Sequence, residues 1–358
     1  MKIVKIAILN DTHWGARNDN AAIAEHQHKF YREVFFPYLK ENGITTIFHL
    51  GDVTDRRKYI NFVTAKNLEE QFMRVCADEG IELYMVAGNH DTYFKNTNEV
   101  NSLRQLYGNS NYENLHLYWE EPVELDMDGC KIMLAPWICP ENYDASMKAM
   151  ADTKAQILMG HFEITGFEMD KGHLCDHGMD RKVFQKFDGV YSGHFHQPSK
   201  HGNIAYLGAQ YEMTWSDHDQ KRGFSVFDTD TREMTHVRNP FKLFHKIMYN
   251  DADMTIEDVA QLDTSHLTNT FIKVIVVNKS NPYIFDLFLD RLQQSQAADI
   301  KVVEDHQNLD VVDEEELLDE AQDTMTILKQ YVQNLEFKGD KTKVEGFLRE
   351  LYNEAINL

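Results

Sequence analysis

The first 240 residues alternate short apolar runs with amphipathic stretches. Short apolar runs bounded by polar or turn residues are typical of buried strands, whereas apolar residues that recur every three or four positions predict helices. The expected strands cover residues 2–9, 45–52, 81–91, 130–137, 155–161, 187–194, 203–208 and 223–228. The expected helices cover residues 21–39 and 62–76. This order predicts a layered α/β domain with a partly mixed sheet.

The pattern changes after Pro240. Three apolar runs predict strands, and an amphipathic stretch before the last of them predicts a helix. The strands are expected at 244–249, 270–278 and 299–305, and the helix at 283–294. This segment is therefore predicted to be a small, separate α/β unit.

The end of the chain has a third pattern. From Asp313, apolar residues step by three and four positions in two stripes, which residues 338–340 separate. Such stripes predict two amphipathic helices. We therefore expect three parts, which cover residues 1–242, 243–308 and 309–358.

Polar residues gather where strands of the first part end. They are Asp11, His13, Asp52, Asn89, His90, Asp91, His161, His194 and His196. Since the carboxyl ends of strands bind ligands in open α/β sheets, we expect these side chains to lie close together. Carboxylate and amide oxygens with imidazole nitrogens suit divalent cations, and two such cations about 4 Å apart can clamp a phosphate group. The pattern therefore indicates a two-metal hydrolase.

Two histidine pairs share one spacing but differ in their setting. His194 and His196 follow a glycine at the end of an expected strand, where both can be ligands. His26 and His28 lie in an expected helix, where side chains two positions apart point in different directions. We expect the second pair to face solvent.

The composition limits the partners and the compartment. The net charge of −22 argues against a protein that holds DNA by a basic face of its own, although residues 302–328 contribute ten of the acids. A polyanionic substrate would need bound cations or a partner to supply positive charge. The four cysteines have no CxxC spacing, and the chain shows neither a signal peptide nor a membrane span, so we expect a cytoplasmic protein with reduced thiols.

Five motifs carry a resemblance to a known family. They are DTH at 11–13, GDVTD at 51–55, GNHD at 88–91, GH at 160–161 and GHFH at 193–196. As a set and in this order, they resemble the calcineurin-like metallophosphoesterase superfamily. The resemblance implies an α/β fold in which a layered metallophosphoesterase β-sandwich is flanked by helices.

The resemblance also implies a ligand set for two cations. The ligands of one would be Asp11, His13, Asp52 and His196. The ligands of the other would be Asp52, Asn89, His161 and His194, so that Asp52 bridges the two cations.

Three neighbouring residues have other roles by the same resemblance. His90 would contact the phosphate and protonate the leaving oxygen. This role suits imidazole as a chemical group, since its unperturbed pKa lies near neutrality. Asp55 is the second candidate catalytic residue, and its expected role is to orient His90. Asp91 is expected only to support the loop beside His90.

Two branches of the superfamily compete. In the serine/threonine protein phosphatases an arginine after GDxxD grips the phosphate, and Arg56 occupies that place. However, that branch has GNHE where this chain has GNHD, and Arg57 stands where a glycine normally follows. The stretches YLGAQYEMTW and KRGFSVFD are more similar to the SbcD-type branch, the nuclease subunit of double-strand-break repair complexes built on SMC-like ATPases. The compact chain most resembles the phage recombination version of that subunit.

The SbcD-type branch implies a two-metal-dependent DNA nuclease, an exonuclease or endonuclease of DNA replication, recombination and repair. It implies Mn²⁺ as the activating ion, with Mg²⁺ less effective. It also implies a capping domain at 243–308, a helical pair at 309–358 that binds the coiled coil of an SbcC-type ATPase, and a homodimer. For the tail, packing against its own domain stays open as an alternative. The alternative function is a metal-dependent phosphoprotein phosphatase or small phosphodiesterase.

Overall fold

The computed structural model describes residues 4–170, 173–176 and 178–304, together with Val332, Lys341, Lys343, Val344 and Leu348. The helical pair predicted at 309–358 lies outside the described residues, apart from those five positions.

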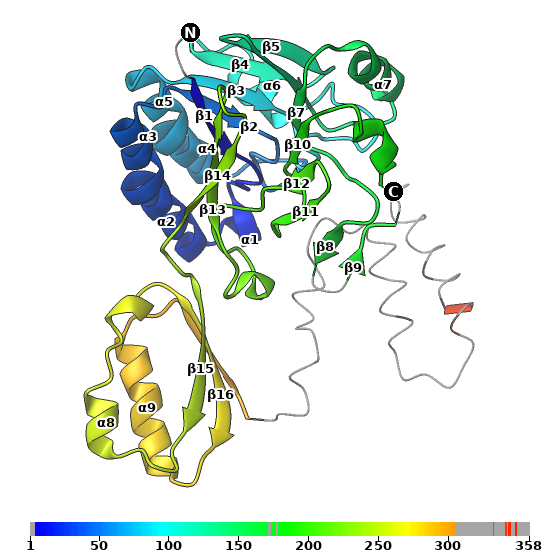
Figure 1. Ribbon diagram of the computed structural model, residues 1–358. Helices are drawn as coiled ribbons and strands as arrows, with labels where there is room; N and C mark the ends of the chain where they lie inside the picture. The colour runs from blue at the N-terminus through cyan, green and yellow to red at the C-terminus, as the bar shows by residue number, and fades with distance from the viewer. Residues whose placement is uncertain are drawn as a thin grey trace.

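Two six-stranded sheets form the main body of the molecule (Figure 1). The first sheet has the order β14-β13-β1-β2-β3-β4, in which β1 to β4 are parallel and β13 and β14 are antiparallel. Its strands are β1 (Lys5–Leu9), β2 (Thr46–His49), β3 (Glu82–Val86), β4 (Leu115–Tyr118), β13 (Gly223–Asp228) and β14 (Met234–Arg238).

The second sheet has the order β11-β12-β10-β7-β6-β5, with a parallel centre and an antiparallel strand at each edge. Its strands are β5 (Val123–Met127), β6 (Cys130–Ala135), β7 (Ile157–Gly160), β10 (Gly189–Ser192), β11 (Ser199–His201) and β12 (Ile204–Tyr206). A short hairpin of β8 (Glu168–Asp170) and β9 (His173–Leu174) projects from it.

Alternation along the strands explains the layers. Ile6 and Ile8 of β1 face the second sheet and pack in one cluster with Leu134. Ala7 and Leu9 face the other way, into the helices that cover the first sheet. Those helices are α2 (Ala21–Phe30), η1 (Tyr31–Phe35), α3 (Phe36–Asn42), α4 (Phe62–Leu68), η2 (Glu69–Met73) and α5 (Arg74–Asp78). The other helical elements of the main body are α1 (Ala16–Asp19), α6 (Ser102–Tyr107), α7 (Tyr143–Asp152), η3 (Arg181–Phe184) and η4 (Trp215–Asp217). The predicted layered α/β fold is confirmed.

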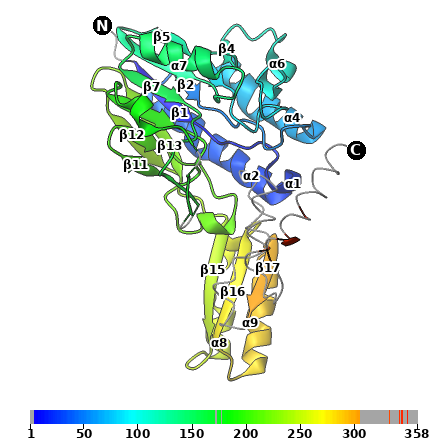
Figure 2. The ribbon, with the colours of Figure 1, turned by 90° about the vertical axis from the view of Figure 1, so that its right-hand side faces the viewer.

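A separate three-stranded parallel sheet follows, which we call the cap (residues 243–304). It consists of β15 (Phe244–Asn250), α8 (Ile256–Ala260), η5 (Ser265–Leu267), β16 (Phe271–Asn278), α9 (Pro282–Gln294) and β17 (Asp299–Val303). It has an apolar core of its own, in which Phe285 and Phe288 of α9 pack against the sheet. Figure 2 shows the cap beneath the main body, joined to it at the start of β15. The three strands and the long helix occur where the sequence predicted them.

The sequence pattern does not indicate the edge strands of the two six-stranded sheets, which are β4, β5, β11 and β14. Their residues are mostly half-buried or exposed, as in the pattern of β14, so they lack the continuous apolar run of a central strand. Among the described residues, no helix combines the length and apolar character that a membrane span requires.

The prediction that His26 and His28 face solvent is wrong. Both lie on α2, but His26 is only 7% exposed and its ring lies 6.5 Å from that of Phe241. His28 packs beside Trp14, with a distance of 5.9 Å between ring centroids. Phe241 of the connection to the cap covers His26, and Trp14 of the main body covers His28, so neither side chain points into open solvent.

Candidate metal centre

The seven predicted ligands lie at one edge of the sandwich, after the carboxyl ends of five strands. Asp11 and His13 follow β1, Asp52 follows β2, Asn89 follows β3, His161 follows β7, and His194 and His196 follow β10. Four of them have a left-handed backbone, with φ of 48° at Asp11, 43° at His13, 54° at Asp52 and 86° at His194. Residues other than glycine rarely adopt this backbone conformation, and those that do cluster at functional sites.

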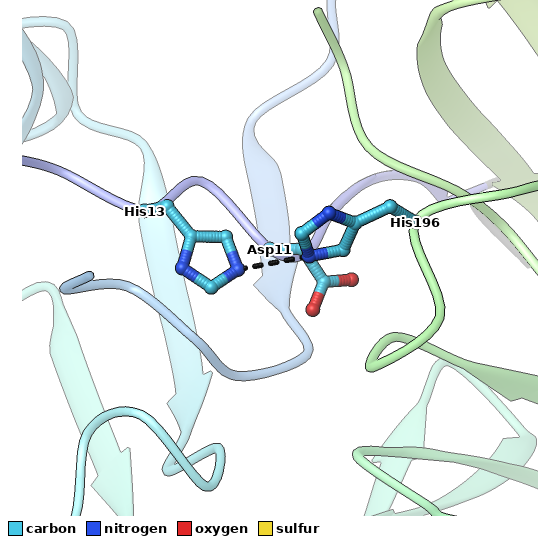
Figure 3. Close-up of side chains that lie close together, drawn as sticks. All are labelled: Asp11, His13 and His196. Carbon is cyan, nitrogen blue, oxygen red and sulfur yellow. Dashed lines mark hydrogen bonds between the residues drawn. The ribbon is translucent and has the colours of Figure 1, made fainter. Parts of the chain in front are cut away.

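Asp11, His13 and His196 form the first group of side chains (Figure 3). Their candidate ligand atoms all lie within 4.8 Å of one another. The Nε2 atoms of the two histidines are 3.0 Å apart, and one of them must present a lone pair because a hydrogen bond between them uses a single N–H. The Asp11 carboxylate is held in place by the backbone N–H of His194 at 3.0 Å.

Asp52, His161 and His194 form the second group. The Oδ1 atom of Asn89 joins it, at 2.8 Å from Nε2 of His161 and 2.9 Å from Nδ1 of His194. Nδ1 of His161 donates to the carbonyl oxygen of Leu50 at 2.8 Å, which directs Nε2 toward the group. This second bond fixes the ring as in many metal-binding histidines.

Asp52 lies between the two groups. Its Oδ2 atom is 3.3 Å from Nε2 of His161 and 3.8 Å from Nε2 of His13. Two glycines make room for it: a Cβ on Gly88 would overlap Oδ1 of Asp52, and one on Gly51 would lie 2.7 Å from Nδ1 of His161. The structure therefore brings together the seven residues that the motifs singled out, with Asp52 in the middle.

His90 and Asp55 make a contact that differs in detail from the expected one. Nδ1 of His90 lies 2.6 Å from the backbone carbonyl oxygen of Asp55, not from its carboxylate. The carboxylate instead lies 3.4 Å from Nδ1 of His13. Asp55 thus orients His90 through its main chain and His13 through its side chain.

Asp91 has the supporting place that the sequence predicted. Its carboxylate is fully buried and accepts hydrogen bonds from the backbone N–H groups of Val53, Thr54 and Gly88. The hydroxyl groups of Thr54 and Ser102 also donate to it. With so many protein donors it is a structural carboxylate that ties two of the motif loops together.

The donor set fits divalent cations. The carboxylates of Asp11 and Asp52 are 0% and 1% exposed, and a buried charge is costly unless an opposite charge compensates for it. Mixed carboxylate, amide and imidazole ligands are those of first-row divalent metals. The same side chains therefore suit two cations that share Asp52.

Comparison with known proteins agrees with this geometry. A family model described as calcineurin-like phosphoesterase matches residues 4–198. The chain belongs to this family. It is 30% identical to exonuclease subunit 1 of Enterobacteria phage T4, over 98% of this chain and 99% of that one. It is 22% identical to a subunit of the nuclease SbcCD from Staphylococcus saprophyticus, over 91% of this chain and 93% of that one.

Among solved structures, purple acid phosphatase PPD1 from yellow lupin (Lupinus luteus) matches with a TM-score of 0.39 and 12% identity, over 66% of this chain and 53% of that one. That likeness is too low to carry an argument. The family and the two groups of side chains together indicate a dinuclear divalent metal site.

The electrostatics of the phosphoesterase site show how the side chains balance charge without cations. Burial opposes protonation of His13, but Asp55, Asp52 and Asp11 outweigh it and raise its pKa to about 10. Burial also opposes protonation of His161, and there Asp52 and Asp11 raise the pKa to about 9. Protonated His13 and His161, one in each group, thus compensate the charge of the buried carboxylates. Bound cations would displace the extra protons from these two imidazoles.

The phosphoesterase site opens into a cavity of about 690 Å³. One wall carries four of the proposed ligands, His13, Asp52, His194 and His196, with His90. Another carries aromatic side chains of the cap and of η4, between β12 and β13. The aromatic residues are Trp215, Phe244 and Phe271. This wall was not indicated by the sequence, because nothing in the local pattern shows which strand ends of the cap approach the main body.

Arg56 is not brought to the cavity. Its guanidinium is bound to the carboxylate of Asp19 at 2.9 Å, and it lies over the ring of Tyr59. Arg17 and Asn18 line the cavity, but Arg56 is not among the described residues that do. The phosphatase-like arginine therefore does not take the position that the GDxxD motif suggested.

Proposed function

We propose that this chain is a two-metal-dependent DNA nuclease that acts as the nuclease subunit of an ATPase–nuclease complex in DNA replication, recombination and repair. The observation that carries the proposal is the cluster of seven ligand-type side chains, with Asp52 in its middle and His90 beside it in the cavity. The match over the whole chain to a phage exonuclease subunit supports DNA as the substrate.

The chemistry divides between cations and side chains. When bound, the two cations would supply Lewis acidity and neutralise the charge on the phosphate oxygens. His90 would act as the general acid in its doubly protonated form: Nδ1–H donates to the carbonyl oxygen of Asp55, and the second proton, on Nε2, passes to the departing 3′ oxygen. The backbone N–H of His90 also donates to Oδ1 of Asp52 at 2.8 Å, which keeps the ring beside the proposed bridging ligand.

Mn²⁺ is the proposed activating ion, with Mg²⁺ less effective. Four of the seven proposed ligands are imidazoles, and the carboxylates and amide supply oxygen. Mg²⁺ prefers an all-oxygen environment and keeps several waters, whereas Mn²⁺ accepts nitrogen and oxygen together.

The cap would act as the capping domain of a DNA cleft. Phe244 and Phe271 stack at 5.1 Å and face the cavity together with Trp215. Of the three, Trp215 and Phe271 are partly exposed, and aromatic side chains of this kind stack on bases irrespective of sequence.

The proposed partners are an SMC-like ATPase subunit of the SbcC type and a second copy of the chain. A net charge of −22 leaves the electrostatic attraction of DNA to cations and to that ATPase. For the dimer, the start of α4 offers an apolar surface: Phe62 is 92% exposed, Val63 65% and Tyr59 63%. Such a complex would work in the cytoplasm, that of the host if a phage encodes the chain.

The test is cleavage of radiolabelled single- and double-stranded DNA with Mn²⁺, beside a generic phosphomonoester. We expect DNA to be cut and the monoester to be a poor substrate. His90→Ala should keep Mn²⁺ binding and abolish cleavage, while His116→Ala, which changes a histidine paired with Glu82 on β3, should leave cleavage unchanged. Full activity of His90→Ala on DNA would contradict the proposed role, and preferential hydrolysis of the monoester would favour the phosphatase alternative.

A further inference from the structure

A buried charged network connects the proposed metal ligand His196 to the cap. Its three charged residues, Glu212, Asp217 and Arg222, are each 2% exposed. They lie in the segment between β12 and β13, which contributes none of the seven proposed ligands. Buried charges are costly unless each is paired and hydrogen-bonded, so their contacts indicate what they hold in place.

Arg222 holds the backbone of a proposed ligand. Its Nη1 atom donates to the backbone carbonyl oxygen of His196 at 2.5 Å. The same oxygen accepts the backbone N–H of Ala209 at 3.1 Å. Two donors on one carbonyl fix the main chain of His196, whose imidazole belongs to the group drawn in Figure 3. Outer partners of this kind orient a metal ligand although they never touch the metal.

Asp217 joins Arg222 to the turn that precedes it. Its Oδ1 atom accepts from Nη2 of Arg222 at 2.5 Å. Its Oδ2 atom accepts from the backbone N–H groups of Met213 at 2.8 Å and Thr214 at 2.9 Å. The carboxylate therefore orders the turn that carries Trp215, and this turn lines the same cavity as His196.

Glu212 attaches the other end of this turn to the cap. Its Oε2 atom accepts from the backbone N–H groups of Leu243 at 2.7 Å and Phe244 at 2.9 Å, where the chain enters β15. The cap holds the turn from a second side, since the ring of Trp215 packs edge-on against Phe244 at 4.9 Å and lies 4.5 Å from Nζ of Lys273.

We propose that Glu212, Asp217 and Arg222 are positioning residues. They couple the contact between the cap and the turn that carries Trp215 to the metal position formed by Asp11, His13 and His196. This inference rests on the proposed two-metal function. Loosening the contact between Glu212 and β15 loosens the turn, then Arg222, and then the main chain of His196. Since coupling is reciprocal, a substrate that holds the cap against this turn strengthens the binding of the cation at this metal position. The bound cation in turn favours the contact between the cap and the turn.

Titration of the metal-free, full-length protein with Mn²⁺ by calorimetry tests the coupling without reference to cleavage. The key variant is Glu212→Gln, which keeps the shape of the side chain, weakens its bonds to the cap and touches none of the seven proposed ligands. We expect two bound Mn²⁺ ions in the wild type, and about tenfold weaker binding of one of them in Glu212→Gln, with the other unchanged. Arg222→Lys should weaken the same ion at least as much.

Asp251→Asn is the matched control. This buried carboxylate also accepts two backbone N–H groups, those of Ser280 and Asn281, but it lies within the cap and contacts no member of the network. We expect its Mn²⁺ binding to equal that of the wild type. Circular dichroism establishes that each variant is folded.

The coupling is overturned if folded Glu212→Gln and Arg222→Lys bind both ions as the wild type does, if both ions weaken equally, or if Asp251→Asn has the same effect. A wild type that binds two ions but cuts no DNA would refute the proposed nuclease function instead, and the titration would still decide the coupling.

Discussion

Asp52, at the edge of the sandwich that carries the proposed ligands (the metal edge), and Asp251, in the cap, are two buried carboxylates that the protein satisfies to very different extents. In the cap, Asp251 accepts hydrogen bonds from the backbone of Ser280 and Asn281 and from the Ser280 hydroxyl, so the protein itself satisfies its charge. At the metal edge, Asp52 accepts one backbone N–H, from His90, and otherwise faces imidazoles. Burial alone therefore does not distinguish a structural carboxylate from a functional one.

The backbone shows the same difference. Asp11 and His13 have a positive φ just after the carboxyl end of β1, and Asp52 just after that of β2, whereas Asn269 and Gln296, the described cap residues with a positive φ, lie before β16 and after α9. Strain in side-chain-bearing residues is tolerated where the surroundings over-determine it. A buried carboxylate with few protein donors on a strained backbone therefore indicates a site that is completed by something other than the chain.

The largest effect that this contrast predicts is at Asp52. Asp52→Asn keeps the size of the side chain but removes the negative charge shared by both groups, so we expect a loss of more than about 100-fold in Mn²⁺ affinity and in DNA cleavage. Calorimetry with Mn²⁺ and gel assays on labelled DNA measure the two losses. Retention of both ions at wild-type affinity would show that Asp52 is not the bridge.

A smaller effect is expected at Asp55, which stands beside the metal edge. Asp55→Asn leaves the backbone carbonyl that holds His90 but removes the charge 3.4 Å from Nδ1 of His13. We expect about tenfold weaker Mn²⁺ binding at the position of His13, and cleavage restored by raising the Mn²⁺ concentration. If saturating Mn²⁺ does not restore cleavage, the carboxylate acts on His90 or on the substrate rather than through His13.

These two residues also show how far the sequence reaches. Asp52 was predictable because a glycine–aspartate pair after an apolar run places a carboxylate at a strand end, and the order of the motifs gave its companions. The part played by Asp55 was not, because spacing along the chain cannot tell whether a residue acts through its side chain or its carbonyl group.

Long-range pairing was equally beyond the local pattern. Arg56 follows the GDxxD motif, yet it pairs with Asp19, which lies 37 positions earlier. His26 looked exposed because its helix was considered without Phe241, which comes from the connection to the cap. The central strands, by contrast, were predictable because their burial on both faces leaves an unbroken apolar run.

At Asp251 the contrast predicts an effect on stability but none on metal binding. Asp251→Asn removes the charge that fixes the entry to α9, so we expect the melting temperature of the metal-free protein to fall by a few degrees. Addition of Mn²⁺ should raise the melting temperature of this variant by as much as it raises that of the wild type. A smaller rise in the variant would mean that the cap and the metal edge are less separate than their hydrogen bonds indicate.

The smallest predicted effect, on the free energy of unfolding, is at the joint between the main body and the cap, by which we mean the contact of His26 on α2 with Phe241. Burial lowers the pKa of His26 to about 4, with Lys29 and His245 acting in the same direction. Because the unfolded chain takes up this proton near pH 6.5, the contribution of His26 to folding is complete above that pH and declines as the pH falls from 6.5 to 4. At pH 5.5 the decline amounts to about 1 kcal/mol.

The variant His26→Leu cannot take up this proton. Urea unfolding of the metal-free protein at pH 7.5 and 5.5 should therefore show a loss of stability about 1 kcal/mol smaller in His26→Leu than in the wild type, while the same exchange at the exposed His201 serves as the control. Equal losses in the wild type and His26→Leu would mean that the joint opens to water before the protein unfolds, and the cap would then be attached mainly through Glu212 and the turn that carries Trp215.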